Sequence, residues 1–415
     1  MSSLQPVRGT HDILPEENRR HRHICETGRR VAELYGYQEF ATPIFEFSEV
    51  FTRTLGDASD IVTKEMYSFV DRNGDELTLR PEGTAGIVRA LLSEGLSQHL
   101  PLKIFYQGPM FRHERPQKGR LRQFHQIGVE LLGVGESIGD VEIILLATQI
   151  LSELGVLDAT ALELNSIGDV ESRAAYRKIL VEYLEDYRKD LSEESRARLD
   201  RNPLRILDSK DEKDRKILEK VPLLPNYLNA PSREAFAEIC AGLDDLGVEY
   251  ELNPRLVRGL DYYCHTAFEF TTGTLGAQAT VLAGGRYDGL VSAMGGPETP
   301  GIGWAAGIER IAMMLEATPE PVRPVAIIPV SNNVEPEALR LAQELRREGY
   351  AIDLGYRGNL SKRLKRANKL GAVAAILLGE EEIAKGSVTL RDLDSGEQES
   401  VSLKTLKDRL AAFRR

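Results

Sequence analysis

Five basic side chains lie within eleven residues of the chain, from Arg112 to Arg122. The segment connects two expected strands, Leu102 to Phe111 and Arg122 to Leu132, which are expected to pair as antiparallel neighbours. Guanidinium groups bind phosphates and carboxylates through paired, planar hydrogen bonds. The pattern therefore predicts an anion-binding loop on a hairpin, and a solvated basic loop without a ligand is the alternative.

The returning strand carries different chemistry on its two faces, because successive side chains of a strand point to opposite sides of a sheet. One face carries apolar residues and a histidine: His125, Ile127, Val129 and Leu131. The other face carries Phe124, Gln126, Gly128 and Glu130. A ring, an amide, a gap and a carboxylate in a row predict the wall of a pocket for a small polar ligand.

Another arginine follows a glycine-rich strand, in the segment from Gly303 to Leu315. The helix expected there has one apolar stripe with i, i+3, i+4, i+7 spacing, made of Ile308, Ile311, Ala312 and Leu315. Arg310 lies off this stripe. We expect it to face a ligand, and an ordinary surface arginine is the alternative.

Three further blocks combine charged and aromatic side chains with glycine. They read RPEGT from Arg80 to Thr84, LVRGLDYY from Leu256 to Tyr263, and AGGRYDGL from Ala283 to Leu290. Taken alone, Gly284-Gly285 predicts only a turn. Arg258 taken alone is more simply a structural residue in a salt bridge. The three blocks together are more informative about function than any one of them alone.

Together these segments resemble the class II aminoacyl-tRNA synthetases, over essentially the whole chain. The hairpin from Phe111 to Gln126 is similar to motif 2 of that class in its histidine-specific form, and Gly303 to Leu315 is similar to motif 3. The blocks at Leu256 and Ala283 resemble the two signatures of the histidine-specific enzymes. The helix before Tyr35 and the strand that ends at Pro43 have the form of motif 1, which builds the dimer interface in the class.

The resemblance implies a role for individual residues, with Arg112, Arg258 and Arg310 as the catalytic charges. It places histidine against Glu82, Gly83, Thr84, Arg112, Gln126, Glu130, Arg258, Tyr262, Tyr263 and Tyr287. It places ATP against Arg112, Glu114, Arg120, Phe124 and Arg310. It places the acceptor end of the tRNA against Arg115 and Gln117. It implies no metal site built from protein ligands.

The implied reaction is the ATP-dependent activation of histidine to histidyl-adenylate, followed by transfer to the 3′ end of the histidine tRNA. ATP is then a substrate, Mg2+ accompanies its phosphates, and the chain is expected to form a homodimer. One alternative is a synthetase-like, histidine-sensing regulatory subunit of ATP phosphoribosyltransferase, although such paralogues typically lack the anticodon domain. Another is a class II synthetase for a different amino acid. A class I synthetase or a P-loop kinase is disfavoured, since HIGH, KMSKS and GxxxxGK[ST] do not occur.

The order of expected elements predicts an α+β fold, in which a class II antiparallel sheet with flanking helices is followed by an α/β domain. A helix is expected over Glu16 to Tyr35 and a hairpin around Asn73-Gly74. The charged, helix-forming stretch of about 170–247 is expected to be an insertion in a catalytic domain of residues 1–321. Three prolines near residue 321 predict a stiff linker, and residues 322–415 alternate strands with helices as an anticodon-binding domain with parallel strands.

Composition indicates a soluble, cytoplasmic protein. Of its 415 residues 42% are hydrophobic, no apolar run is long enough for a membrane span, and no targeting segment is recognisable at the N-terminus. The three cysteines are too scattered for a disulfide framework or a zinc site. The net charge of −11 is unusual for a protein that binds RNA, but the last 94 residues carry +4. Their basic run from Lys362 to Lys369 is interpreted either as an RNA surface or as a solvated helix face.

Overall fold

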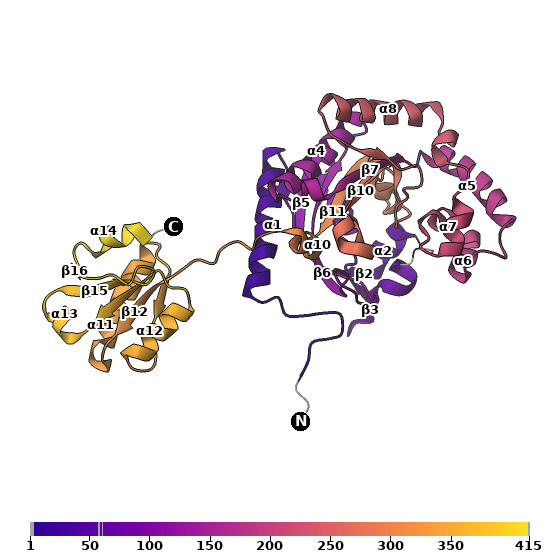
Figure 1. Ribbon diagram of the computed structural model, residues 1–415. Coiled ribbons are helices and arrows are strands. Elements are labelled where there is room, and N and C mark those ends of the chain that lie inside the picture. Colours follow the sequence, from indigo (N-terminus) through magenta and orange to yellow (C-terminus); the bar gives the residue numbers. More distant parts are fainter. Residues whose placement is uncertain (1–3, 57–58, 60, 414–415) are drawn as a thin grey trace. The chain divides into compact units, whose positions relative to one another are not determined.

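The chain divides into two compact units, Met1–Pro319 and Glu320–Arg415. The computed structural model describes residues 4–56, 59 and 61–413, and each unit is described here by itself (Figure 1). The division falls inside the proline-rich segment that was expected to be a linker. Within the described part of the chain, no helix combines the length and the apolar character needed to cross a bilayer.

The first unit is built on an eight-stranded sheet with the order β1-β5-β6-β11-β10-β9-β7-β8. The interior pairs are antiparallel, while β1 pairs with β5, and β8 with β7, in parallel at the two edges. The strands are β1 (Gln38–Glu39), β5 (Leu102–Phe111), β6 (Gln123–Leu132), β7 (Ala161–Ser166), β8 (Glu251–Leu252), β9 (Cys264–Thr271), β10 (Thr280–Arg286) and β11 (Gly301–Gly307). The expected antiparallel sheet is confirmed, with these parallel edges added.

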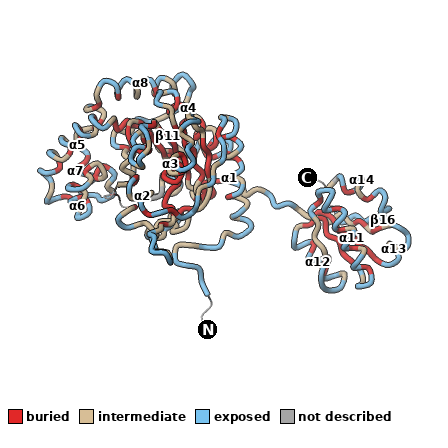
Figure 2. Tube along the Cα trace, turned by 180° about the vertical axis from the view of Figure 1, so that it is seen from behind, coloured by how far each residue is buried: buried red, intermediate tan, exposed pale blue. Residues whose placement is uncertain are grey.

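One face of this sheet is covered by α1 (Pro15–Leu34), α4 (Ser137–Glu153) and α10 (Ile308–Met314), which contact one another or the strands. The apolar face of β6 enters this core, where Ile127 and Val129 are fully buried. Figure 2 shows the buried residues concentrated in the sheet and in the helices against it. The opposite face of β6, with Phe124 and Gln126, is left for other contacts.

A second, three-stranded sheet has the order β2-β4-β3 and consists of β2 (Phe45–Phe47), β3 (Tyr67–Val70) and β4 (Glu76–Leu79). The hairpin predicted at Asn73-Gly74 connects β3 to β4, and Gly74 takes the left-handed conformation that glycine tolerates best (φ +94°). The stretch from 37 to 47 therefore contributes to two sheets, with β1 in the large one and β2 in the small one. Helices α2 (Ser48–Leu55), α3 (Thr84–Ser93) and α9 (Leu290–Ala293) flank this region.

The segment expected to be a helical insertion is helical: α5 (Val170–Glu185), α6 (Glu193–Arg201), α7 (Glu212–Leu218) and α8 (Ala230–Asp245). Each helix begins after a residue whose side chain accepts a backbone N–H of the first turn, namely Asp169, Ser192, Asp211 and Asn229. Helices α5, α6 and α7 lie together at one side of the first unit, and α8 packs along α4 (Figure 1).

The second unit has a five-stranded sheet with the order β13-β12-β14-β15-β16. Its elements are β12 (Val325–Pro329), α11 (Glu335–Arg347), β13 (Ile352–Leu354), α12 (Leu360–Lys369), β14 (Ala374–Leu378), α13 (Glu380–Ala384), β15 (Ser387–Asp392), β16 (Gln398–Ser402) and α14 (Leu406–Leu410). The first three strands are parallel and the last two form an antiparallel hairpin, so the expected α/β alternation is confirmed. The short helix α13 was not expected.

Candidate active site

A cavity of about 200 Å³ opens on the face of the large sheet that α1 and α4 leave uncovered. Many of the residues expected to bind a ligand line it: Glu82, Thr84, Arg112, Glu114, Arg120, Phe124, Gln126, Arg258, Tyr262, Tyr263 and Arg310. They come from both strands of the motif 2 hairpin, from the loop before β9, from the start of α3 and from α10. The fold thus brings together side chains that lie up to 228 residues apart in sequence.

Backbone carbonyls hold two of the three arginines in the cavity. Arg112, directly after β5, donates from Nε to the Pro81 carbonyl (2.9 Å), and its guanidinium lies 5.3 Å from the centre of the Phe124 ring. Arg310 donates to the carbonyls of Gly119 (3.2 Å) and Thr280 (2.6 Å). Burial is the main cause that lowers the pKa of both guanidinium groups. Removing a guanidinium group from water disfavours its charged form, so an anion bound in the cavity would stabilise both cations.

Arg258 enters the same cavity from the loop before β9. It forms an ion pair with Glu269 of β9, and its guanidinium lies 5.5 Å from the centre of the Tyr263 ring. Its Nε atom is buried without a hydrogen-bond partner, and so is Oε1 of Gln126, which lines the same cavity. An unsatisfied buried donor or acceptor costs about 1–3 kcal/mol. A polar ligand that satisfied both atoms would recover this energy.

Glu130 lies beneath the cavity rather than on its surface, with 1% of its area exposed. Its carboxylate accepts hydrogen bonds from the hydroxyls of Thr84 (2.6 Å) and Tyr287. Burial, the largest cause, raises the pKa of Glu130 to about 8. A Cβ atom on Gly303 would collide with this carboxylate, so only glycine fits at that position of β11.

The aromatic residues of the two signature blocks form one cluster. The ring centres of Tyr262 and Tyr263 are 4.6 Å apart, and those of Tyr262 and Tyr287 are 5.7 Å apart. Tyr287 is fully buried and, like Glu130, does not line the open cavity. The cluster forms an aromatic wall between Arg258 and Glu130.

The RPEGT block forms the start of α3. Both carboxylate oxygens of Glu82 accept backbone N–H groups, from Thr84 (2.6 Å) and Ala85 (2.9 Å), and burial is the main cause that raises its pKa. Gly83 does not line the cavity. It lies against the ring of Tyr106, which a Cβ atom at this position would overlap. Gly83 therefore shapes the cavity wall through Tyr106.

Arg115 and Gln117 lie outside the cavity, exposed on the loop between β5 and β6. The loop tip is closed by an isolated bridge between Gln117 and Arg120, and Arg120 forms an ion pair with Glu114. The structure thus separates the residues expected to bind ATP, which face inward, from those expected to bind tRNA, which face solvent.

Comparison with known proteins decides the family. Residues 9–311 match the model of the histidyl-tRNA synthetase family, and residues 324–413 match that of the anticodon binding domain. The chain belongs to the histidyl-tRNA synthetase family. It is 60% identical over 414 residues to a histidine–tRNA ligase of Rhodospirillum rubrum and 56% identical over 413 residues to that of Gluconacetobacter diazotrophicus, and each alignment covers 100% of both chains.

Solved structures agree with this family assignment. Apo histidyl-tRNA synthetase of Staphylococcus aureus is 32% identical, with a TM-score of 0.82 over 98% of this chain and 99% of that chain. A protein from Bacillus halodurans described as an ATP phosphoribosyltransferase regulatory subunit/histidyl-tRNA synthetase is 24% identical, with a TM-score of 0.65, and shares the fold. The full-length relatives favour the ligase over the regulatory subunit.

In an enzyme of this family, replacing Glu130 with glutamine is expected to raise the KM for histidine by roughly tenfold. This factor corresponds to the free energy of about one hydrogen bond. Thr84 and Tyr287 donate to different oxygens of Glu130, and in glutamine an NH2 group, which cannot accept a hydrogen bond, would replace one of those two oxygens. Steady-state pyrophosphate exchange at varied histidine measures this effect, and an unchanged KM in a folded variant would count against the role.

The same substitution is expected to change the pH dependence of stability. In the folded protein the raised pKa of Glu130 keeps its proton bound up to about pH 8. Its contribution to the free energy of unfolding is therefore complete below the unfolded-state pKa and is lost as pH rises through the folded-state value. Urea unfolding at pH 5 and at pH 8.5 should show a smaller loss of stability in Glu130→Gln than in the wild type.

Glu309 is a site residue that the sequence interpretation did not assign. Its carboxylate accepts the backbone N–H of His125 (2.9 and 3.0 Å) and bonds Nδ1 of the same residue (2.8 Å). It thereby ties the start of α10, which carries Arg310, to β6 between Phe124 and Gln126. The available signal was a carboxylate directly before an arginine expected to face a ligand.

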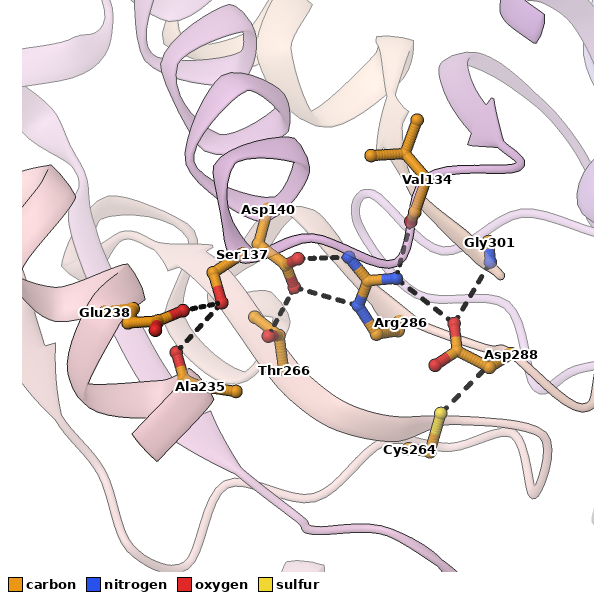
Figure 3. A network of polar contacts seen from close by, with 10 residues as sticks. All are labelled: Val134, Ser137, Asp140, Ala235, Glu238, Cys264, Thr266, Arg286, Asp288 and Gly301. Atoms are coloured by element: carbon orange, nitrogen blue, oxygen red, sulfur yellow. Dashed lines mark hydrogen bonds and ion pairs between the residues drawn. The ribbon is translucent and has the colours of Figure 1, made fainter. Parts of the chain in front are cut away.

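Arg286, within the second signature block, is buried in a polar network rather than exposed to a ligand (Figure 3). It pairs with Asp140 of α4 and donates to the carbonyl of Val134 (2.9 Å) and to Asp288 (3.2 Å). Asp288 in turn accepts the N–H of Gly301 (3.1 Å). The network anchors the end of β10 and with it the adjacent Tyr287.

Proposed function

We propose that the cavity activates histidine with ATP and that the chain then transfers the histidyl group to its tRNA. The observation that carries this proposal is the convergence of Arg112, Arg258 and Arg310, from three distant segments, on one cavity. The family signature supplies the amino acid, because the curated relatives that cover the whole chain are histidine–tRNA ligases.

In the first step a carboxylate oxygen of histidine attacks the α-phosphorus of ATP, and pyrophosphate leaves. The carboxylate is already ionised at pH 7, so the step needs no general base. Catalysis then depends on alignment, which can contribute roughly 7–11 kcal/mol, and on charge placed against the phosphates. We assign the α-phosphate and the reacting carboxylate to Arg112 and Arg258, and the γ-phosphate to Arg310.

The remaining ligand contacts are assigned by the family resemblance and by position in the cavity. The adenine ring is proposed to stack on Phe124, with its amino group near Glu114. The histidine amino group is proposed to lie near Thr84 and Gln126, whose Oε1 atom is buried without a partner. Glu130 and the tyrosine cluster are proposed to hold the imidazole ring.

Mg2+ fits this site as an ion bound mainly by the phosphates of ATP. It prefers hard oxygen ligands and is commonly held by one or two carboxylates together with phosphates. The carboxylate of Glu309 lines the cavity and would complete such a ligand set. When bound, the ion would neutralise part of the negative charge of the phosphates.

In the second step the 2′ or 3′ hydroxyl of the terminal adenosine of the tRNA takes the histidyl group and AMP leaves. Arg115 and Gln117, exposed beside the cavity, are proposed to hold the acceptor end. The first unit, with its insertion, is proposed to be the catalytic domain and residues 322–415 the anticodon-binding domain. The reaction is proposed to take place in the cytoplasm.

The basic run of α12 offers the anticodon domain a smaller RNA surface than its sequence suggested. Arg363 is buried and donates to the Pro329 carbonyl and to Glu335 (3.2 Å). Arg366 is paired with Asp353 (3.0 Å). Three lysines of the run stay exposed: Lys362, Lys365 and Lys369.

A homodimer is proposed from the exposed apolar face of the small sheet. Phe45, Phe47 and Phe69 are 50%, 54% and 44% exposed. The register pairs them with Leu77 and Leu79 of the central strand β4, so all five side chains lie on the same face. Large apolar side chains gathered on one face typically mark an interface. Sedimentation should give twice the mass of the chain for the wild type and a shift toward the monomer for Phe47→Glu.

The function is tested by ATP–pyrophosphate exchange with each of the twenty amino acids. Exchange with histidine alone is expected, because a polar pocket rejects analogues that lack its hydrogen-bonding groups by roughly 10⁴-fold. Exchange with another amino acid would reassign the substrate. Histidine binding without any exchange would instead support the regulatory-subunit alternative.

A further inference from the structure

The N-terminal segment forms a tight turn that no catalytic role accounts for. The N–H of Thr10 donates to the carbonyl of Val7 (2.9 Å), and the Thr10 hydroxyl donates to the same oxygen (2.7 Å). Gly9, inside this turn, has φ +88°. A residue with positive φ in a turn is usually glycine, because a Cβ atom makes that conformation costly.

The turn is attached to the base of the loop between β5 and β6. The carbonyl of Gly9 accepts the N–H of Arg122 (2.8 Å). Arg122 closes the loop, since its own carbonyl accepts the N–H of Arg112 (2.9 Å) and its Nε donates to the carbonyl of Glu114 (3.2 Å). The N-terminal turn therefore bonds the residue that holds the two sides of the loop together.

The contact between the turn and the loop leaves no room for a side chain. A Cβ atom on Gly9 would lie 2.8 Å from Cγ of Arg122 and 2.9 Å from Cγ of Pro116. Such distances are shorter than van der Waals contact, so the loop would have to move. Pro116 lies between Arg115 and Gln117, the exposed residues assigned to the acceptor end.

We propose that the turn around Gly9 is a positioning element for the tRNA step: by packing against Pro116 it sets the orientation of Arg115 and Gln117. The inference rests on the proposed function and deepens it. It names an element outside the three class II motifs that acts on the second step of the reaction.

The residues of the ATP cavity are held by contacts that do not involve the turn, so the activation step and the tRNA step can be affected separately. No residue of the turn lines the cavity. Arg112 is held by the Pro81 carbonyl, and the loop tip is held at the Gly119 carbonyl by Arg310. A displaced turn should therefore disturb the outer side of the loop more than its inner side.

The test is Gly9→Ala, measured for both steps in the full-length protein. We expect kcat/KM for tRNA in aminoacylation to fall roughly tenfold or more, since a displacement of about 1 Å can cost up to 10²-fold. Pyrophosphate exchange without tRNA should stay within about threefold of the wild type. The matched control is Gly36→Ala, because Gly36 also has positive φ (+82°) but its Cβ would meet no atom within 4 Å.

A second variant avoids strain in the N-terminal backbone. Pro116→Ala removes the ring that the turn contacts, and it should lower aminoacylation while exchange is unchanged. In a double-mutant cycle, Gly9→Ala and Pro116→Ala should not be additive, because both act on one contact. Equal losses in both steps, losses matched by Gly36→Ala, or full additivity would each overturn the proposal. Absence of histidine-dependent exchange in the wild type would instead refute the proposed function itself.

Discussion

Replacing Arg258 with alanine is expected to slow histidine-dependent pyrophosphate exchange by roughly 10²-fold or more, the typical cost of one lost electrostatic donor. Arg258 is the cavity guanidinium whose Nε is buried without a partner while its other end is fixed by Glu269. A donor already oriented by an ion pair needs no reorganisation when charge develops on the phosphate. The loss should therefore appear mainly in kcat rather than in the KM for ATP.

The control for this prediction lies in the same loop. Arg255 is exposed and donates to the Glu219 carbonyl (3.0 Å), away from the cavity lining, so Arg255→Ala should leave exchange nearly unchanged. Arg258→Lys keeps the charge but not the planar fork, and it should recover only part of the rate. Near-normal exchange in a folded Arg258→Ala protein would remove the assignment of this residue.

A large loss of stability is expected from Arg286→Ala, about 3–5 kcal/mol in the free energy of unfolding of the first unit. Arg286 is 3% exposed and its partner Asp140 is 1% exposed, so truncation would leave a carboxylate buried without its countercharge. The hydroxyl of Thr266, 2.5 Å from Asp140, is a weak replacement for a cation. Urea unfolding followed by probes in each unit measures the effect, because the two units can unfold separately.

A matched exposed pair tests whether burial is the cause. Arg22 and Glu26 are 74% and 55% exposed on α1, so Arg22→Ala should leave the free energy of unfolding nearly unchanged. The penalty of Arg286→Ala comes from the unpaired carboxylate of Asp140. The double variant Arg286→Ala/Asp140→Leu should therefore recover much of the stability. A loss of less than 1 kcal/mol in Arg286→Ala would contradict the network as an anchor of β10.

Local patterns in the sequence were sufficient to predict several elements. The alternation along β6 predicted which side chains face the core and which face a ligand, and the buried Ile127 and the cavity-lining Gln126 agree with it. The strand Leu102–Phe111 has the bounds that were expected, and the turn predicted at Asn73-Gly74 connects β3 to β4. These features follow from side-chain periodicity over a few residues, which is written in the chain itself.

Specific residue chemistry also carried the family assignment. The motif 2 hairpin and the two signature blocks are dense in charged, aromatic and glycine residues at fixed spacing. This spacing can be read directly from the sequence, without knowledge of the tertiary structure. The resemblance could therefore indicate roles for Arg112, Arg258 and Arg310 from the sequence. It could not indicate which atoms support them.

Those supports were decided only by the tertiary structure. Asp140 forms an ion pair with Arg286, Glu309 accepts a hydrogen bond from His125, and Gly9 accepts one from Arg122. The two residues of each pair are separated by more than one hundred positions in the sequence. No periodicity links such residues, because their proximity results from how the sheet brings distant strands and helices together. The sequence by itself determined the local elements and the chemistry they carry, whereas the burial that raises the pKa of Glu130 and leaves Arg258 with an unsatisfied donor arises only when the whole unit is packed.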